Sequence, residues 1–176
     1  MVIDRENGAR RAIEHLSCHE NFHQVCMGHS CVENYIHLIF ATRLREDLIL
    51  SSMESRLHSY LCGIARKRNS SVIIINGTAN HLHLLLRLHP TIALSTLVKE
   101  LKSYSTGWMK KQDQAQFSWQ VGYGGFSVSH SMLEKVSKYI ECQKEHHQKC
   151  SFNEEIESLI SRWHLRWSFL RDDNVA

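Results

Sequence analysis

The sequence predicts an α+β fold of the ferredoxin-like type, in which helices pack on one face of an antiparallel sheet. The main observation is the order of the apolar patterns: strand, helix, strand, strand, helix, strand and then further helices. The length of 176 residues suits one domain with appendages. With 43% apolar and 22% charged residues, the composition is that of a packed globular protein. We expect the second face of the sheet to be free to bind a partner.

The first half of the chain contains three predicted strands and one helix. Residues 35–42 have the apolar, aromatic and β-branched content of a strand. A helix follows and ends near Asn69, because apolar residues recur at helical spacing and cations gather where the helix dipole favours them. Residues 72–75 form a buried strand, Asn76-Gly77 a turn and residues 81–88 the next strand. The apolar positions of the helix are Met53, Leu57, Tyr60, Leu61 and Ile64.

The second half of the chain is mostly helical. An apolar stripe at residues 94–108 predicts the second helix, and short strands are expected within residues 116–128. A capping box at residues 131–134 opens a third helix that continues through His147. The same signal at residues 151–154 precedes a last amphipathic helix.

Basic residues are concentrated in the centre of the chain. Residues 34–112 hold eleven basic and four acidic side chains, a net charge of +7, whereas the whole chain carries +3. This pattern suits a partner that bears phosphates, and it is also that of a mildly basic solvated surface. No stretch has the apolar length that a membrane span needs, and the charged start lacks the core of a signal peptide. We therefore expect a cytoplasmic protein without a membrane partner.

His81 and His83 lie on the predicted strand 81–88, whose even-numbered positions are all leucine. Alternate side chains of a strand point to opposite faces, so the leucines share the core face and the two imidazoles share the other face. Two imidazoles placed in this way can both reach one divalent cation. The pattern is equally that of two polar residues on a solvated sheet face, and the residues alone leave both interpretations open.

Polar side chains on the third predicted helix are candidate partners of the two histidines. Tyr139, Gln143 and His146 fall together on the flank of its apolar stripe. A phenol, an amide oxygen and an imidazole next to the buried face can project over the sheet. The alternative interpretation is that Tyr139 is a boundary residue with a packed ring and a solvated hydroxyl.

Taken together, these segments resemble the single-tyrosine transposases of small bacterial insertion sequences, within the HUH endonuclease superfamily. His81-Leu-His83 resembles the His-hydrophobic-His motif, and Tyr139-Ile-Glu-Cys-Gln143 resembles the helix that bears the catalytic tyrosine. The REP-associated tyrosine transposases are close relatives of this family. Further matching segments, in the family's order, are residues 37–42, 75–77, 119–123, 126–129 and 143–147.

The resemblance implies a catalytic domain at residues 34–155, preceded by an extension at 1–33 and followed by a helical tail at 156–176. It implies that Tyr139 attacks single-stranded DNA and forms a 5′-phosphotyrosine intermediate, after which the strand is transferred. It also implies a divalent metal, Mg²⁺ or Mn²⁺, that polarises the scissile phosphate. The implied metal ligands are His81, His83 and Gln143.

The resemblance further implies a substrate and an assembly. The substrate would be single-stranded DNA with hairpin ends, and the enzyme a homodimer whose tyrosine acts in its own subunit or in the partner. His37 and His146 are expected to line the site. The candidates for DNA phosphates are Lys99, Lys102, Arg66, Lys67, Arg68 and Arg87. The alternative function is a non-catalytic or domesticated module of the same fold that binds DNA or RNA hairpins.

The chain departs from the family beside the first histidine. The position before it is usually Asp in these proteins, whereas Asn80 stands here. We expect this difference to alter a contact that orients His81 rather than the metal site itself.

Overall fold

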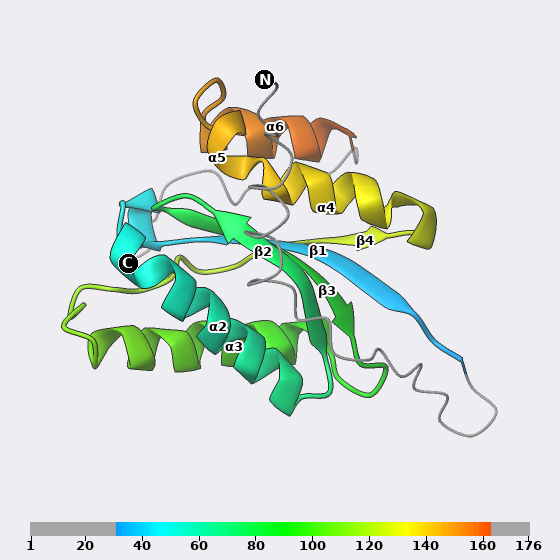
Figure 1. Ribbon diagram of the computed structural model, residues 1–176, viewed down its shortest axis with the longest axis horizontal. Coiled ribbons are helices and arrows are strands. Elements are labelled where there is room, and N and C mark those ends of the chain that lie inside the picture. Colours follow the sequence, from blue (N-terminus) through cyan, green and yellow to red (C-terminus); the bar gives the residue numbers. More distant parts are fainter. Residues whose placement is uncertain (1–30, 163–176) are drawn as a thin grey trace, which may run out of the picture.

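The computed structural model describes residues 31–162, which form a four-stranded antiparallel sheet with helices on both faces (Figure 1). Most of the predicted extension and tail therefore lies outside the described residues. The sheet order is β2-β3-β1-β4, which confirms the predicted ferredoxin-like core. The strands are β1 (Asn34–Ala41), β2 (Ser71–Gly77), β3 (His81–Leu88) and β4 (Gly124–Val128).

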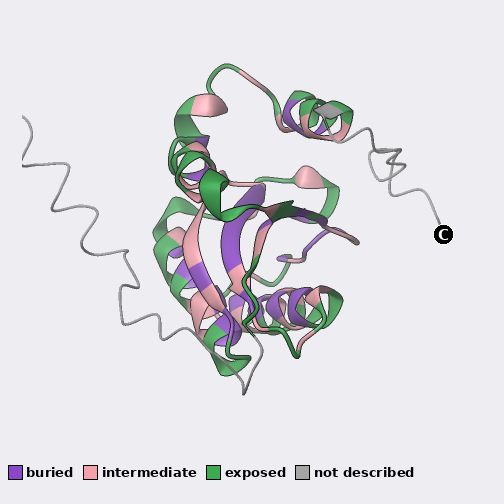
Figure 2. Cartoon of the chain, turned by 90° about the vertical axis from the view of Figure 1, so that its right-hand side faces the viewer, coloured by how far each residue is buried: buried purple, intermediate pink, exposed green. Residues whose placement is uncertain are grey.

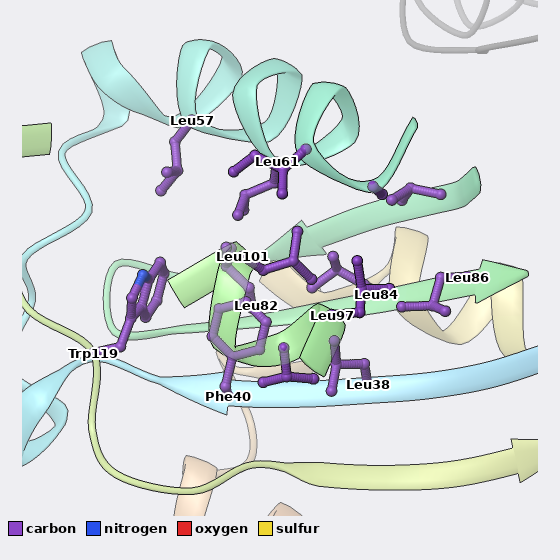
Figure 3. Packing of buried hydrophobic residues seen from close by; sticks show 14 of the residues in the cluster. Leu38, Phe40, Leu57, Leu61, Leu82, Leu84, Leu86, Leu97, Leu101 and Trp119 are labelled. Carbon is purple, nitrogen blue, oxygen red and sulfur yellow. The ribbon is translucent and has the colours of Figure 1, made fainter. Parts of the chain in front are cut away.

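Two long helices, α2 (Ser51–Lys67) and α3 (Leu94–Lys110), pack on one face of the sheet and enclose the main hydrophobic core (Figure 3). The even-numbered leucines of β3 point into this core, as their alternation predicted. Asn69 adopts a left-handed backbone with φ of 54° just after α2, which confirms it as the residue that stops the helix. The core includes Leu38, Leu57, Leu61, Leu82, Leu84, Leu97 and Leu101, each fully buried.

The second face of the sheet is covered by three further helices, α4 (Leu133–Glu141), α5 (Gln143–His146) and α6 (Phe152–Arg162) (Figure 1). The expectation that this face is free was therefore wrong. Ile156 of α6 is 3% exposed and packs with Ile39 and Phe126 from the sheet. Burying a side chain of this size contributes about 1.5–3 kcal/mol to the packing of α6 on the sheet. Figure 2 shows the buried strands between the two helical layers.

Local structure differs from the predictions at two points before α4. Strand β2 continues through Gly77, where an added Cβ would lie 2.2 Å from the carbonyl oxygen of His81, so glycine permits the close approach to β3. Among residues 116–128 the structure has β4 and an isolated bridge between Thr42 and Trp119. Two short 3₁₀ helices, η1 (Arg43–Arg45) and η2 (His130–Met132), follow β1 and β4.

Of the two capping boxes predicted at helix N-termini, one is absent from residues 31–162 and the other is present. The prediction of a capping box at residues 131–134 was wrong. Helix α4 begins after a 3₁₀ turn, and its N-cap, Met132, makes no side-chain capping bond within the described chain. The second capping box was confirmed: Glu154 accepts the N–H of Ser151 at 2.8 Å, and the Ser151 hydroxyl accepts the N–H of Glu154 at 3.3 Å. In the part of the chain that is described, no helix is long and apolar enough to cross a membrane.

Candidate active site

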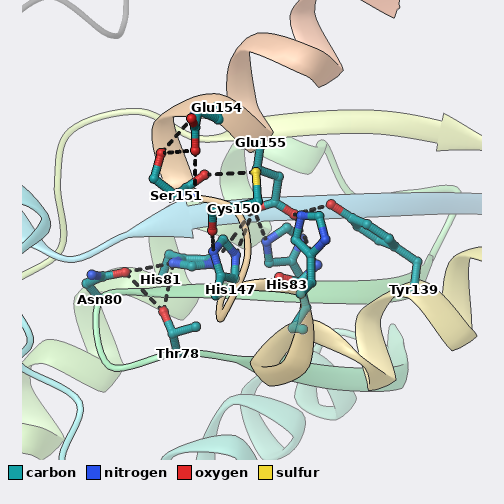
Figure 4. Close-up of polar contacts among 12 residues, drawn as sticks. Thr78, Asn80, His81, His83, Tyr139, His147, Cys150, Ser151, Glu154 and Glu155 are labelled. Carbon is teal, nitrogen blue, oxygen red and sulfur yellow. Dashed lines mark hydrogen bonds and ion pairs between the residues drawn. The ribbon is translucent and has the colours of Figure 1, made fainter.

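His81 and His83 project from the central strand β3 toward the layer formed by α4, α5 and α6 (Figure 4). Both imidazoles are buried, with relative exposures of 1% and 0%, and their ring centroids are 5.2 Å apart. The alternation along β3 therefore placed the rings together on one face, as predicted. The interpretation as two solvated polar residues is excluded, because the helical layer covers them.

The Nδ1 atom of His81 is held by residues of the preceding turn. It lies 2.7 Å from Oδ1 of Asn80 and 2.9 Å from the hydroxyl of Thr78. The amide nitrogen of Asn80 donates to Asp47 at 2.9 Å, so the oxygen of Asn80 is the atom that faces His81. An amide oxygen only accepts, so Nδ1 of His81 carries the hydrogen and Nε2 presents a lone pair to the site.

His37, on β1, supports the second imidazole. Its Nε2 lies 2.9 Å from Nδ1 of His83, and the antiparallel pairing of β1 with β3 brings the two rings together. Burial, with a smaller contribution from the neighbouring His83, lowers the pKa of His37 to about 3. Burial is also the main cause that lowers the pKa of His81 to about 2, and His83 and His147 contribute to this value. These two rings are therefore neutral at physiological pH, which is the form that binds metals.

Tyr139, on α4, and Gln143, on α5, reach the same place within one chain. The ring centroid of Tyr139 lies 6.0 Å from that of His83 and 6.1 Å from that of His37. The side chain of Gln143 is fully buried, and its Oε1 has no hydrogen-bond partner among residues 31–162. His146 lies beside them, its ring centroid 5.6 Å from that of Tyr139. The structure thus brings the sequence-predicted candidates together.

The carboxylate of Glu155, on α6, lies at the centre of this group and was missed by the sequence analysis (Figure 4). Its Oε1 accepts hydrogen bonds from the hydroxyl of Tyr139 and from Nε2 of Gln143, the latter at 3.0 Å. Its Oε2 lies 3.1 Å from Nε2 of His147 and 3.4 Å from Nε2 of His83. The Nε2 of His81 is 3.9 Å from the same oxygen.

A sequence signal for Glu155 exists in the last helix. The capping box fixes the start of α6, and position 155 is four residues before Leu159, which packs against the small cluster on the sheet. Glu155 therefore belongs to the inward face, where an acidic residue is unusual unless it has partners. Its side chain is 2% exposed.

The electrostatic environment keeps this carboxylate ionised. Burial by itself raises the pKa of Glu155, but the contact with His83 and the hydrogen bonds from Tyr139 and Gln143 outweigh it and lower the pKa. An ionised carboxylate offers oxygen ligands of the kind that divalent cations bind.

The site fits a divalent metal ion. The Nε2 atoms of His81 and His83 are buried and make no hydrogen bond within the described residues. One ligand atom from each of His81, His83, His147 and Glu155 lies within 4.8 Å of all the others. Unpartnered buried imidazole nitrogens around a carboxylate are the arrangement that a bound cation would satisfy.

The predicted DNA-binding cations do not gather at this site. Arg66, Lys67 and Arg68 are at the end of α2, and Lys99 and Lys102 are on α3, both on the opposite face of the sheet. The ammonium of Lys102 donates to the carbonyls of Gln120 and Gly122, and burial lowers its pKa to about 8.

Two of the predicted cations are paired with acidic residues. Arg68 pairs with Glu100 from α3. Arg87, on β3, pairs with Glu33 at 2.8 Å. The structure therefore accounts for Arg68 and Arg87 as ion-pair partners.

Comparison with known proteins identifies the family. The family described as "Transposase IS200 like" matches residues 30–143. The chain is 29% identical to the ISDra2 transposase TnpA of Deinococcus radiodurans over 114 residues, which is 61% of this chain and 81% of that protein.

Two solved structures have the same fold. A crystal structure of a protein described as a transposase of D. radiodurans superposes with a TM-score of 0.53 and 24% identity, over 66% of this chain and 95% of that one. The structure of a REP-associated tyrosine transposase bound to a REP hairpin gives 0.54 and 15%, over 66% of this chain and 70% of that one.

The chain belongs to the IS200-like transposase family. This confirms the family and the transposase function predicted from the sequence.

Proposed function

We propose that this transposase cleaves and rejoins single-stranded DNA through a covalent link to Tyr139. The main support for this proposal is that the hydroxyl of Tyr139 donates a hydrogen bond to Glu155. The carboxylate of Glu155 also faces the buried nitrogens of His81 and His83. A phenol held in this way is oriented and polarised toward the histidine pair. The arrangement supports Tyr139 as a nucleophile rather than as a boundary residue.

The reaction is a transesterification. The phenolic oxygen of Tyr139 forms a bond to phosphorus, and the bond from phosphorus to the 3′ oxygen of the preceding nucleotide breaks. The phenol gives up its proton and the leaving oxygen takes one up, which frees a 3′-hydroxyl and leaves a 5′-phosphotyrosine. A 3′-hydroxyl on another strand end then attacks this link, so the transfer needs no nucleotide cofactor.

His81, His83 and Gln143 would hold Mg²⁺ or Mn²⁺ beside the scissile phosphate. The ion would polarise the phosphoryl oxygens and offset the charge that grows in the transition state. The Nε2 atoms of His81 and His83 make no hydrogen bond among the described residues, and the unpartnered Oε1 of Gln143 supplies an oxygen. Nε2 of His37 contacts Nδ1 of His83, and His146 lies beside the phenol of Tyr139.

The proposed substrate is single-stranded DNA with hairpin ends, which a homodimer would bind at two strand ends. The REP-associated relative is bound to a hairpin, which supports the same class of DNA here. In this chain the tyrosine and the histidine pair meet within one subunit, which supports action in cis. Lys99, Lys67 and Arg66 remain candidates for phosphate contacts on the α2 and α3 face.

The test is formation of a covalent adduct. Labelled single-stranded DNA with a flanking hairpin, incubated with the protein and Mn²⁺, should give a denaturation-resistant protein–DNA band. Tyr139→Phe should abolish the band, and Tyr104→Phe, a half-exposed tyrosine on α3, should retain it. A band that survives Tyr139→Phe would assign the nucleophile elsewhere, and hairpin binding without cleavage at any Mn²⁺ concentration would favour the non-catalytic module.

A further inference from the structure

The side chains that complete the metal site come from the C-terminal end of the described chain. His147 follows α5 and Glu155 lies on α6, so both are beyond the residues 30–143 that match the family. The turn between them is fixed by two contacts: Nδ1 of His147 with the carbonyl of Cys150 at 2.9 Å, and the capping box of α6. Both side chains are therefore positioned by the fold of this chain itself.

The hydrogen bonds at Nδ1 decide which atoms these rings present to Glu155. A carbonyl oxygen only accepts, so Nδ1 of His147 carries a hydrogen and Nε2 is the atom that faces Glu155. The same holds for His81, whose Nδ1 faces the oxygen of Asn80. The Nε2 atoms of the two rings face Oε2 of Glu155, at 3.1 Å from His147 and 3.9 Å from His81.

Lone pairs that converge on a carboxylate oxygen repel one another unless a positive charge lies among them. A proton on His147 would relieve one contact, but it would leave the Nε2 atoms of His81 and His83 without partners in the described structure. One cation shared by all four side chains would satisfy every atom at once. The separations support this, because the four ligand atoms lie within 4.8 Å of one another.

We propose that Glu155 and His147 are ligands of the same divalent ion as His81 and His83, so that α6 and the preceding turn complete the metal site. This inference rests on the proposed metal-dependent function and adds ligands to it. Because Oε1 of Glu155 also accepts from Tyr139, one carboxylate links the ion to the nucleophile. Glu155 thereby fixes the position of the phenol relative to the metal.

Binding of Mn²⁺ to the full chain without DNA tests the proposal. Mn²⁺ is the probe because free Mn²⁺ is measured directly by electron paramagnetic resonance and because imidazole ligands favour transition metals over Mg²⁺. We expect Glu155→Gln to weaken Mn²⁺ binding at least tenfold. Glu157→Gln, with the same change of charge at an exposed position of α6, should stay within twofold of the wild type.

Further variants test the proposal even if Glu155→Gln does not fold. Thermal unfolding without metal shows whether Glu155→Gln is folded. If it is not, His147→Asn provides the test, and we expect it also to lose at least tenfold in Mn²⁺ affinity. Glu155→Asp, which keeps a carboxylate on a shorter side chain, should bind Mn²⁺ more tightly than Glu155→Gln.

Unchanged Mn²⁺ affinity in Glu155→Gln would overturn the proposal. Tighter binding would overturn it as well, because Glu155 would then compete with the ion instead of binding it. His83→Ala separates this failure from failure of the proposed function. If His83→Ala loses Mn²⁺ while Glu155→Gln keeps it, only the added ligands are wrong, whereas a wild-type chain that binds no Mn²⁺ contradicts the metal-dependent function itself.

Discussion

The hydroxyl of Tyr139 donates a hydrogen bond to the carboxylate of Glu155, which lies sixteen residues further along the chain on a different helix. The bond ties α4 to α6 across the proposed active site. Its acceptor is almost fully buried and stays ionised. The same contact therefore contributes both to the stability of the helical layer and to the orientation of the proposed nucleophile.

Removal of this hydrogen bond should lower stability. A hydrogen bond to a charged group contributes about 1.5–3 kcal/mol, so Tyr139→Phe should reduce the free energy of unfolding by an amount in this range. Urea unfolding in the presence of EDTA measures the change without any contribution from metal. Tyr104→Phe on the exposed side of α3 is the control and should change the value by less than about 0.5 kcal/mol. Equal stability of the two variants would contradict the hydrogen bond.

His37 should affect metal binding although it is not a proposed ligand. Its ring holds Nδ1 of His83 at 2.9 Å and so fixes the direction of the opposite nitrogen. Loss of such a supporting contact typically costs 10- to 100-fold in metal affinity. His37→Leu should weaken Mn²⁺ binding by about this factor in calorimetric titration, whereas His130→Leu, at an exposed position, should not. Equal affinities would show that His83 is held by other groups.

Acid should destabilise the protein through His58, which lies on α2 outside the site. Burial, with a smaller contribution from Lys144, lowers the pKa of His58 to about 4, although Glu54 acts to raise it. The unfolded chain has an ordinary histidine pKa of about 6.5, so between pH 6.5 and 4 it binds more protons than the folded chain. Protonation therefore favours unfolding over this range, and the contribution stops growing below pH 4.

Comparison with His58→Leu isolates this effect from other buried histidines. Between pH 7.5 and 4 the wild type should lose about 3 kcal/mol more of its unfolding free energy than the variant. Denaturant titrations at several pH values provide the measurement. Parallel pH profiles for the two proteins would mean that His58 is not held neutral in the folded state.

Much of the site could be predicted because it depends on local periodicity. The alternation of leucine with His81 and His83 determines which face of β3 carries the imidazoles. Helical spacing likewise predicted that Tyr139 and Gln143 share one side of a helix, and both reach the site although a break at Cys142 separates α4 from α5. The strand alternation follows from backbone geometry alone, so it does not depend on contacts with distant segments.

The missed features depend on contacts between distant segments. The helix expected to run through His147 is interrupted at Cys142, where the side chain of Asn76 donates to the carbonyls of Ile140 and Glu141. These carbonyls would otherwise accept from the next helical turn, so a residue of β2 ends α4. The site position of Glu155 depends in turn on how the chain returns after this break, which no local pattern specifies.

The contacts of Asn80 show why asparagine fits beside the first histidine. Its oxygen faces Nδ1 of His81 and accepts from Thr78, while its amide nitrogen donates to Asp47 at 2.9 Å. An aspartate at this position could still accept from His81, but it would turn a second carboxylate toward Asp47. The asparagine therefore suits a chain that has an acidic residue at position 47, and the contact with His81, which we expected to be altered, is retained.

Substitutions at Asn80 and Asp47, made singly and together, test whether Asp47 is the reason for asparagine at position 80. Asn80→Asp alone replaces a hydrogen bond with a repulsive contact at a partly exposed site, so it should lower the unfolding free energy by about 0.5–1.5 kcal/mol. Addition of Asp47→Asn restores a donor opposite the new carboxylate and should recover most of this loss. The double variant should also bind Mn²⁺ more tightly than the wild type, because a carboxylate behind His81 makes its Nε2 a stronger ligand. Urea unfolding and Mn²⁺ titration of all three variants provide the test, and a double variant as unstable as Asn80→Asp would rule out Asp47 as the reason for asparagine here.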